Sequence, residues 1–203
     1  MKKLTFLLPV LQVMFLFCSC TASYDVTSTR NPEYNGRINK MLVVVIKLDS
    51  ISGSGMEEEI ANSLNSGMKR ADSYRKIIPN EEKKTVAEIL ALMQDMNYDG
   101  LLIVSPYEGD YYVNPEIPKF RLKGTEVKGD LIKSYIQYKS RSGIYLSAGE
   151  FFTEVALFNI NDEMIVWISS LKTEAKMFEF IGSRVSILGQ TIFAELQKKK
   201  IIK

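Results

Sequence analysis

The run Met41-Leu42-Val43-Val44-Val45-Ile46 decides the fold of this 203-residue chain. It is continuously apolar and rich in β-branched side chains, which favour strands. A strand that is apolar on both faces belongs in the middle of a sheet covered on both sides, usually a parallel sheet. The run therefore predicts an α/β domain with this strand near its centre.

The segment after the central strand predicts a helix and a short second strand. A Gly/Ser turn leads into the helix, which Ser54 and Glu57 are expected to begin as a capping box. Ile60 and Leu64 then recur at four-residue spacing and predict its buried face. Residues 74–78 are expected to form the short strand.

A second helix and a third strand complete this half of the domain. Asn80 is expected to cap the helix, and Gly100 is expected to end it in a left-handed conformation. Residues 101–104 (Leu-Leu-Ile-Val) are a second continuous apolar run and predict a buried strand. Residues 41–104 therefore predict the order β-α-β-α-β.

The carboxyl-terminal half predicts an antiparallel meander. Residues 132–139 alternate apolar and polar side chains, which is typical of a strand with one face in water. Residues 151–160 and 164–173 predict a hairpin, joined at 161–163 by Asn-Asp-Glu, of which Asn and Asp tolerate left-handed conformations.

A buried tryptophan and a last helix close the domain. Both faces of the chain are apolar around Trp167, so this ring is expected to anchor the core. An amphipathic helix is expected over residues 182–199. Its inward side chains are expected to be Val185, Leu188, Ile192 and Leu196.

Two stretches carry a resemblance to a known family. Residues 153–167 (TEVALFNINDEMIVW) resemble a strand of the type "ETxLYD" followed by "TGKLVW", and residues 97–104 (NYDGLLIV) are similar to a "GADAVLV" stretch. Both motifs occur in a group of uncharacterised bacterial envelope lipoproteins. The resemblance implies an α/β sandwich like the amino-terminal domain of TolB, related to anticodon-binding-like domains. It carries over no functional residues, because that family has no established enzyme site.

The expected fold is therefore a mixed-sheet α/β sandwich, in which β-α-β-α-β is followed by an antiparallel meander and a C-terminal helix. Fold analogy alone does not give a function.

The amino terminus predicts a secreted, lipid-anchored protein. Lys2 and Lys3 precede a charge-free run from Leu4 to Phe17, which is typical of a signal peptide and too short to span a bilayer. The ending Phe-Cys-Ser-Cys resembles a bacterial lipobox, with Cys20 as the lipidated residue. The expected division is a signal peptide at 1–19, a lipidated cysteine with a flexible tether at 20–36, and a single domain at 37–203.

The residue after the lipidated cysteine bears on the location. It is Thr21 and not an aspartate, which by sorting rules predicts an outer-membrane lipoprotein, and the expected orientation faces the periplasm. The polar, aperiodic composition of residues 21–36 is the reason a tether is expected there.

Composition excludes several classes of chemistry. The chain has no histidine, and its two cysteines are Cys18 and Cys20. Catalysis by Ser-His-Asp or Cys-His, and zinc, haem or iron–sulfur ligation by His or Cys, are therefore excluded in the folded part. Removal of residues 1–19 leaves 24 basic residues against 24 acidic ones. A neutral domain gives no electrostatic footprint for nucleic acid, and no cofactor or metal is expected.

Residues 105–128 predict a long loop. The segment contains three prolines, which deny it a regular central strand, and the aromatic residues Tyr107, Tyr111 and Tyr112. Such a loop is a candidate partner-binding surface, because tyrosine offers contact area at low entropic cost. The alternative is that the three rings cover the sheet as part of the core.

Three functions remain open. The first is a non-enzymatic binding or assembly module, anchored to the membrane through Cys20, for another envelope protein. The second is a carboxylate-dependent hydrolase of cell-wall or glycan substrates. The third is a structural accessory subunit whose exposed sheet edge pairs with a partner strand. The candidate acids for the hydrolase are Glu108, Asp110, Glu150 and Glu154.

Overall fold

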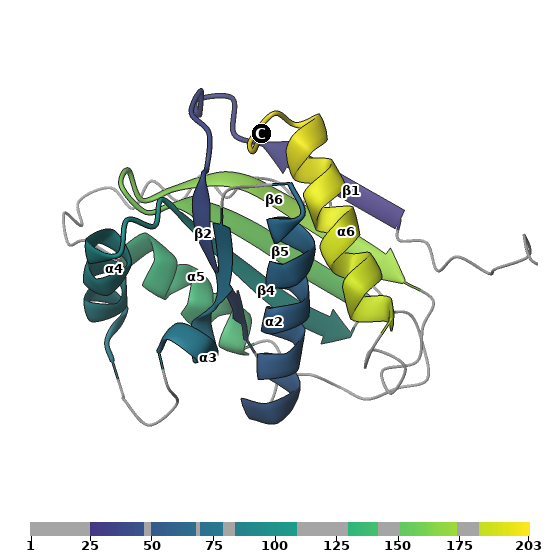
Figure 1. Ribbon diagram of the computed structural model, residues 1–203, viewed down its shortest axis with the longest axis horizontal. Coiled ribbons are helices and arrows are strands. Elements are labelled where there is room, and N and C mark those ends of the chain that lie inside the picture. The colour runs from purple at the N-terminus through teal and green to yellow at the C-terminus, as the bar shows by residue number, and fades with distance from the viewer. Residues whose placement is uncertain are drawn as a thin grey trace, which may run out of the picture.

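The computed structural model describes residues 25–46, 50–67, 70–78, 84–108, 130–141, 151–173 and 183–203, which build one six-stranded sheet with helices on both faces (Figure 1). The strands are β1 (Asp25–Arg30), β2 (Lys40–Val45), β3 (Arg70–Ser73), β4 (Gly100–Glu108), β5 (Phe151–Asn159) and β6 (Met164–Thr173). The helices are α2 (Ser50–Asn65), α3 (Tyr74–Ile77), α4 (Val86–Asp95), α5 (Asp130–Arg141) and α6 (Ser183–Lys198).

The sheet is mixed, as the sequence predicts. Its strand order is β1-β6-β5-β4-β2-β3. β2 pairs in parallel with both β3 and β4, whereas the pairs β4–β5, β5–β6 and β6–β1 are antiparallel. β2 lies between two strands and under helices on both sides, so its continuous apolar run is explained, and the α/β fold class is confirmed.

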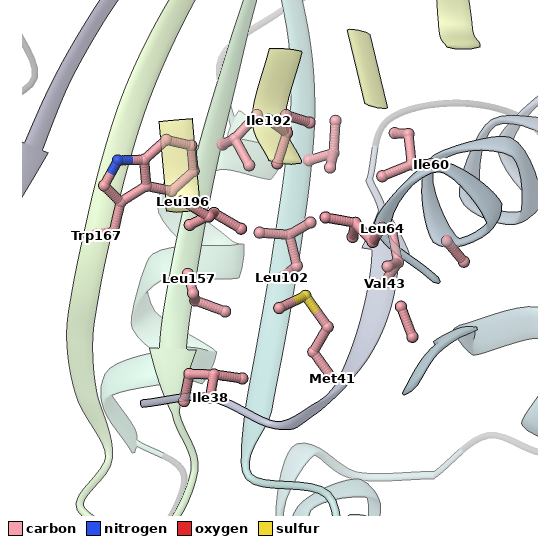
Figure 2. Close-up of a cluster of buried hydrophobic side chains, with 14 of the residues drawn as sticks. Ile38, Met41, Val43, Ile60, Leu64, Leu102, Leu157, Trp167, Ile192 and Leu196 are labelled. Carbon is pink, nitrogen blue, oxygen red and sulfur yellow. The ribbon is translucent and has the colours of Figure 1, made fainter. Parts of the chain in front are cut away.

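One apolar layer lies between the sheet and the pair α2 and α6 (Figure 2). Trp167 on β6 is fully buried in it and confirms the predicted core anchor. The predicted inward face of the last helix is confirmed as well. The buried residues of this layer include Val43, Ile60, Leu64, Leu102, Leu157, Leu188, Ile192 and Leu196.

The second apolar layer lies between the other face of the sheet and the pair α4 and α5. Leu90 and Met93 of α4 are buried in it, as are Ile132 and Tyr135 of α5. The Tyr135 ring meets the ring of Phe158 edge to face, with centroids 5.3 Å apart. Both faces of the sheet are therefore covered, and the domain needs no disulfide to close its core.

The predicted strand over residues 132–139 is wrong, because these residues lie in helix α5. Ile132 and Ile136 are four residues apart, a spacing that fits an alternating strand and a helical turn equally well. Tyr135 resolves the ambiguity. It is buried beside Ile132 at a spacing of three, which only a helix allows.

The predicted tether is wrong for residues 25–36. Asp25–Arg30 form β1, which pairs along its whole length with β6, from Asp25 opposite Lys172 to Arg30 opposite Trp167. Tyr34, further along the same segment, is buried in the core. A polar strand at the edge of a sheet buries little apolar surface, so its composition resembles that of a linker. In the part of the chain that the structure describes, no helix is long and apolar enough to cross a bilayer.

The predicted start of the first helix and the short strand after it are also wrong. Helix α2 begins at Ser50, so Ser54 is inside it and caps nothing, while the Glu57 side chain turns inward. The short strand is Arg70–Ser73, and Tyr74–Ile77 form the one-turn helix α3.

The ends of α4 differ from the prediction as well. Thr85 is the N-cap, in a capping box with Glu88, in place of Asn80. Asn97 takes the left-handed conformation, with φ 58°, in place of Gly100. Gly100 opens β4, where an added Cβ would lie 2.5 Å from the Ile38 side chain. In the hairpin after β5, the left-handed residue is Glu163, with φ 47°.

Candidate functional site

Of the residues predicted for lipidation and partner binding, one lies in the described part of the chain. Tyr107 is in β4, opposite Phe152 of β5. Cys20, Tyr111 and Tyr112 lie outside the described residues, as does the expected loop after Glu108, so their roles stay predictions.

The prediction that residues 105–108 belong to a loop is wrong, because β4 continues through them. Pro106 is tolerated there for a reason that the topology supplies. The pairing of β2 with β4 ends at Val45 opposite Val104, so no strand of the described structure pairs with the side of Pro106 that lacks an N–H.

The candidate acids do not assemble into a catalytic pair among the described residues. Asp110 and Glu150 lie outside them. Glu108 is three register positions from Ser105, the partner of Glu154 on β4. Glu154 itself is buried, accepts a hydrogen bond from the Tyr135 hydroxyl at 2.6 Å, and forms an ion pair with Lys139. Its charge is therefore balanced within the fold.

Glu57 is the second buried carboxylate, and it ties the ends of β2 and β3 together. One of its oxygens accepts from Val45 N at 3.0 Å and from an Arg75 guanidinium nitrogen at 2.8 Å. The other accepts from Ser73 Oγ at 2.9 Å and from Arg75 N at 3.0 Å. Burial raises the pKa of Glu57, and the hydrogen bonds and the Arg75 charge oppose that rise. Glu57 is thus a structural anchor of β3.

A metal centre is not built from the described residues, since they contain no group of three or more His, Cys, Asp or Glu side chains that could hold an ion. Two features of the described fold that can meet a partner are the edges of the sheet, β3 and β1.

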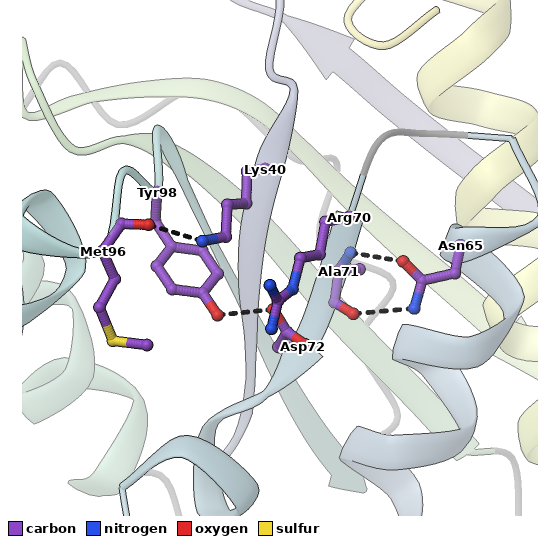
Figure 3. Close-up of polar contacts among 7 residues, drawn as sticks. All are labelled: Lys40, Asn65, Arg70, Ala71, Asp72, Met96 and Tyr98. Atoms are coloured by element: carbon purple, nitrogen blue, oxygen red, sulfur yellow. Dashed lines mark hydrogen bonds and ion pairs between the residues drawn. The ribbon is translucent and has the colours of Figure 1, made fainter.

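The β3 edge is closed by a side chain (Figure 3). Asn65, the last residue of α2, accepts from Ala71 N at 2.6 Å and donates to Ala71 O at 2.8 Å. The amide of Asn65 therefore occupies the same backbone groups that an added strand would need. A four-residue strand with its middle blocked in this way offers no template for pairing.

Charges reinforce the closed β3 edge. Asp72 accepts from Arg70 Nε and from the Tyr98 hydroxyl, each at 2.6 Å. Burial, followed by the hydrogen bond to Asp72, raises the pKa of Tyr98 far above its ordinary value. Lys40 Nζ lies 4.0 Å from the centroid of the Tyr98 ring. Charged side chains at an edge are a common means of preventing strand addition.

The β1 edge is open in the described structure. The backbone N–H of Asn31 donates to Val166 O at 2.8 Å. Because every second residue of a strand directs its backbone groups to the same side, the backbone groups of Thr29 and Thr27 also face β6. The backbone groups of Val26, Ser28 and Arg30 consequently face away from the sheet. No described strand pairs with that side of β1, and β1 contains no proline and no bulge in its register.

Helix α6 lies over one face of β1 (Figure 1) and is bonded to it through side chains. Ser28 Oγ donates to Glu195 at 2.7 Å, and Arg30 donates to Lys199 O at 2.6 Å and to Tyr34 O at 2.8 Å. The Ser28 carbonyl accepts from Lys199 Nζ at 3.3 Å, a bond from a long side chain that can move aside. These bonds hold β1 in place beside α6.

Glu195 is ionised in this arrangement. Burial acts to raise its pKa, but hydrogen bonds from Ser28 and Lys198 and the nearby lysine charges outweigh burial, and the pKa lies below its ordinary value. The bond from Ser28 to Glu195 is thus a charge-assisted one at neutral pH.

Comparisons with known proteins return structural similarity alone. No family model and no curated sequence matches the chain. Two structures of the PelC dodecamer from Paraburkholderia phytofirmans are similar at 14% identity with a TM-score of 0.45, covering 89% of this chain and 100% and 99% of theirs. Lipoprotein GNA1162 from Neisseria meningitidis is similar at 13% identity with a TM-score of 0.38, covering 79% of this chain and 96% of its own. At these values the similarities support no inference about what this chain does. The expected likeness to TolB stays a prediction.

The sequence contains a weak signal for the β1 edge. Val26, Thr27 and Thr29 are β-branched and favour strands, but they stand in a polar segment broken by Pro32 and Gly36. The roles of Asn65 and Arg75 have no such signal, because both depend on strands distant in the chain.

Proposed function

We propose that this protein is a non-enzymatic binding module of the bacterial cell envelope, anchored by acyl chains on Cys20, whose binding surface is the β1 edge. The observation that carries the proposal is the open edge itself. Strand addition to such an edge is a general mode of recognition, in which backbone hydrogen bonds provide the affinity.

The position of β1 in the chain supports the link between anchor and edge. Asp25 follows Cys20 by five residues, which span at most about 18 Å when fully extended. The binding edge would therefore lie close to the membrane surface. Outer-membrane attachment with the domain in the periplasm is part of the proposal, and rests on Thr21 after Cys20.

The internal pairing of Glu57 with Arg75 and of Glu154 with Lys139 supports a binding role over the hydrolase alternative. A general acid or base must reach a substrate, and both carboxylates are already engaged inside the fold. Tyr107, Tyr111 and Tyr112 remain candidates for a second contact surface in the same proposal.

The test of the anchor compares Cys20→Ser with the matched variant Cys18→Ser in cells fed a clickable fatty acid. Cys20→Ser is expected to lose the label and to leave the membrane fraction, whereas Cys18→Ser is expected to keep both. Undiminished label in Cys20→Ser would overturn the anchor. Two or more acyl chains make attachment stable, since each buried methylene contributes about 0.8 kcal/mol.

A further inference from the structure

We propose that the occupant of the β1 edge is β1 of a second copy of this chain, paired antiparallel about a two-fold axis through Ser28. The inference deepens the proposed function by naming the partner. The two sheets would join edge to edge into one continuous sheet, in a closed dimer whose two halves use the same surface.

The backbone geometry selects this register. A two-fold axis perpendicular to the sheet keeps each side chain of the copy on the same face as in the original. Because opposed residues must share a face, the residue numbers of each pair of identical strands must sum to an even value. With Ser28 on the axis, Ser28 faces the partner's Ser28, and Val26 faces the partner's Arg30. Every outward N–H and C=O of these three residues then has a partner. An axis through Thr27 would leave Arg30 outside the paired segment.

The side chains are compatible with this register. Thr27 lies opposite the partner's Thr29, a kind of cross-strand pair that is favourable in sheets. Val26 lies opposite the aliphatic stem of the partner's Arg30, whose head group is held by Lys199 O and Tyr34 O. No like charges oppose one another along β1.

Helix α6 adds charge complementarity at the axis. Glu195 and Lys199 both contact Ser28, at 2.7 Å and 3.3 Å. The axis through Ser28 brings these two side chains beside their own copies. When Lys199 releases the Ser28 carbonyl to the partner's amide, its ammonium group can meet the partner's Glu195. Each Lys199 then pairs with the Glu195 of the other copy, so the same contact forms twice about the axis.

The anchor on Cys20 would strengthen a small contact. A single strand pair buries little area, but two copies held to one membrane face by short segments meet at a high effective concentration. The pairing would therefore be favoured at the membrane over dilute solution. A partner strand free in solution would not gain this advantage, and an unrelated strand would lack the complementary charges of Glu195 and Lys199.

The test is disulfide cross-linking of Ser28→Cys in the full chain within native membranes. Opposed hydrogen-bonded residues have Cα atoms about 5.5 Å apart, within the range that a disulfide spans. Mild oxidation is expected to give a covalent dimer above the background of the parent chain, which controls for the native cysteines.

Thr27→Cys is the matched control on the same strand. In this register Thr27 and its copy are offset by two residues, which puts their Cα atoms about 8 Å apart, beyond the reach of a disulfide. Absence of the Ser28→Cys dimer above the parent, or equal cross-linking of Thr27→Cys, would overturn the proposal.

Proline substitution gives a second test that does not depend on cysteine chemistry. Ser28→Pro removes an outward N–H and keeps the bonds to β6, so it is expected to abolish the dimer in nanodiscs while the domain stays folded. A Ser28→Pro protein that remains dimeric and folded would contradict the proposal. The anchor is tested separately, in a chain that carries both Cys20→Ser and Ser28→Cys. Cross-linking that persists in this double variant would show that the dimer forms without the lipid anchor.

Discussion

The two edge strands of the sheet are both short and polar, yet they are held in different ways. β3 is fixed from within and from its outer side, by the buried Glu57 at its end and by the Asn65 amide on the backbone of Ala71. Among the described contacts, β1 is fixed from one face, by Glu195 of α6 and by Lys199 directly after that helix. In β3 the Asn65 amide occupies the outer backbone groups of Ala71, whereas in β1 no described strand pairs with the outer groups and a lysine side chain, Lys199, contacts the Ser28 carbonyl.

This difference teaches which edge of the sheet is available to a partner. Natural sheets protect edges against unwanted pairing, and the β3 edge has that protection. The β1 edge has no comparable block on its outward N–H groups among the described contacts, although Lys199 contacts the Ser28 carbonyl. Its bonds to Glu195 and Lys199 hold the strand in place, which lowers the entropic cost of association. The three predictions below alter the anchors of each edge in turn.

The largest expected effect is at Glu57. Glu57→Ala removes the ion-pair partner of the Arg75 guanidinium and the hydrogen-bond acceptor of Val45 N and Ser73 Oγ. The free energy of unfolding should therefore fall by about 3–5 kcal/mol. Glu58→Ala is the matched control, because Glu58 forms an exposed ion pair with Lys76 at 3.3 Å; it should change stability by less than about 0.5 kcal/mol. Urea unfolding measures both. Equal effects would mean that Glu57 does not anchor β3.

A smaller effect is expected at Asn65. Asn65→Ala removes two hydrogen bonds to Ala71, at about 0.5–1.5 kcal/mol each, and opens the β3 edge. The variant should therefore be less stable and should associate as concentration rises, measured by thermal unfolding and size-exclusion chromatography.

The control for Asn65 is Asn62→Ala, on the same helix at an exposed position. It should behave like the parent in both measurements. The decisive protein carries Asn65→Ala together with Ser28→Pro, which blocks association through β1. If this double variant stays monomeric at every concentration, the Asn65 amide is not what closes the β3 edge.

The smallest expected effect is the pH dependence of the β1 anchor. The pKa of Glu195 is lowered in the folded chain, so its contribution is present above the ordinary value of about 4.5 and is lost as pH falls through the folded pKa. The loss should be less than about 1 kcal/mol. It should appear as weaker hydrogen-exchange protection of the Thr27 and Thr29 amides at acid pH. Glu195→Gln should show the weaker protection already at neutral pH, and a parent-like profile in that variant would exclude the anchor.

The sequence predicts the centre of this domain well. Continuous apolar runs such as Met41–Ile46 and residues 101–104 have few possible environments, because only a sheet covered on both faces buries them completely. The hairpin of β5 and β6, the burial of Trp167 and the inward face of α6 follow from the same strong apolar patterns.

The sequence is ambiguous where a pattern fits two periods or buries little. Ile132 and Ile136 fit a strand as well as a helix, and only contact with Phe158 across the sheet identifies α5 as a helix. Residues 25–30 show no apolar pattern because no position of β1 is fully buried. Tyr107, which the sequence places in a loop, lies in β4 because β5 supplies a pairing partner that local sequence does not reveal.

The sequence by itself determined the α/β class, the central strand, the buried tryptophan and the exclusion of histidine- and cysteine-based chemistry in the folded part. Hydrophobic burial and residue chemistry are local properties, and a single chain states them directly. Only the tertiary structure decided which strands stand at the edges, that Asn65 blocks one edge, and that α6 supports the other. These features depend on residues far apart in the chain, such as Ser28 and Glu195, that the pairing of strands brings together.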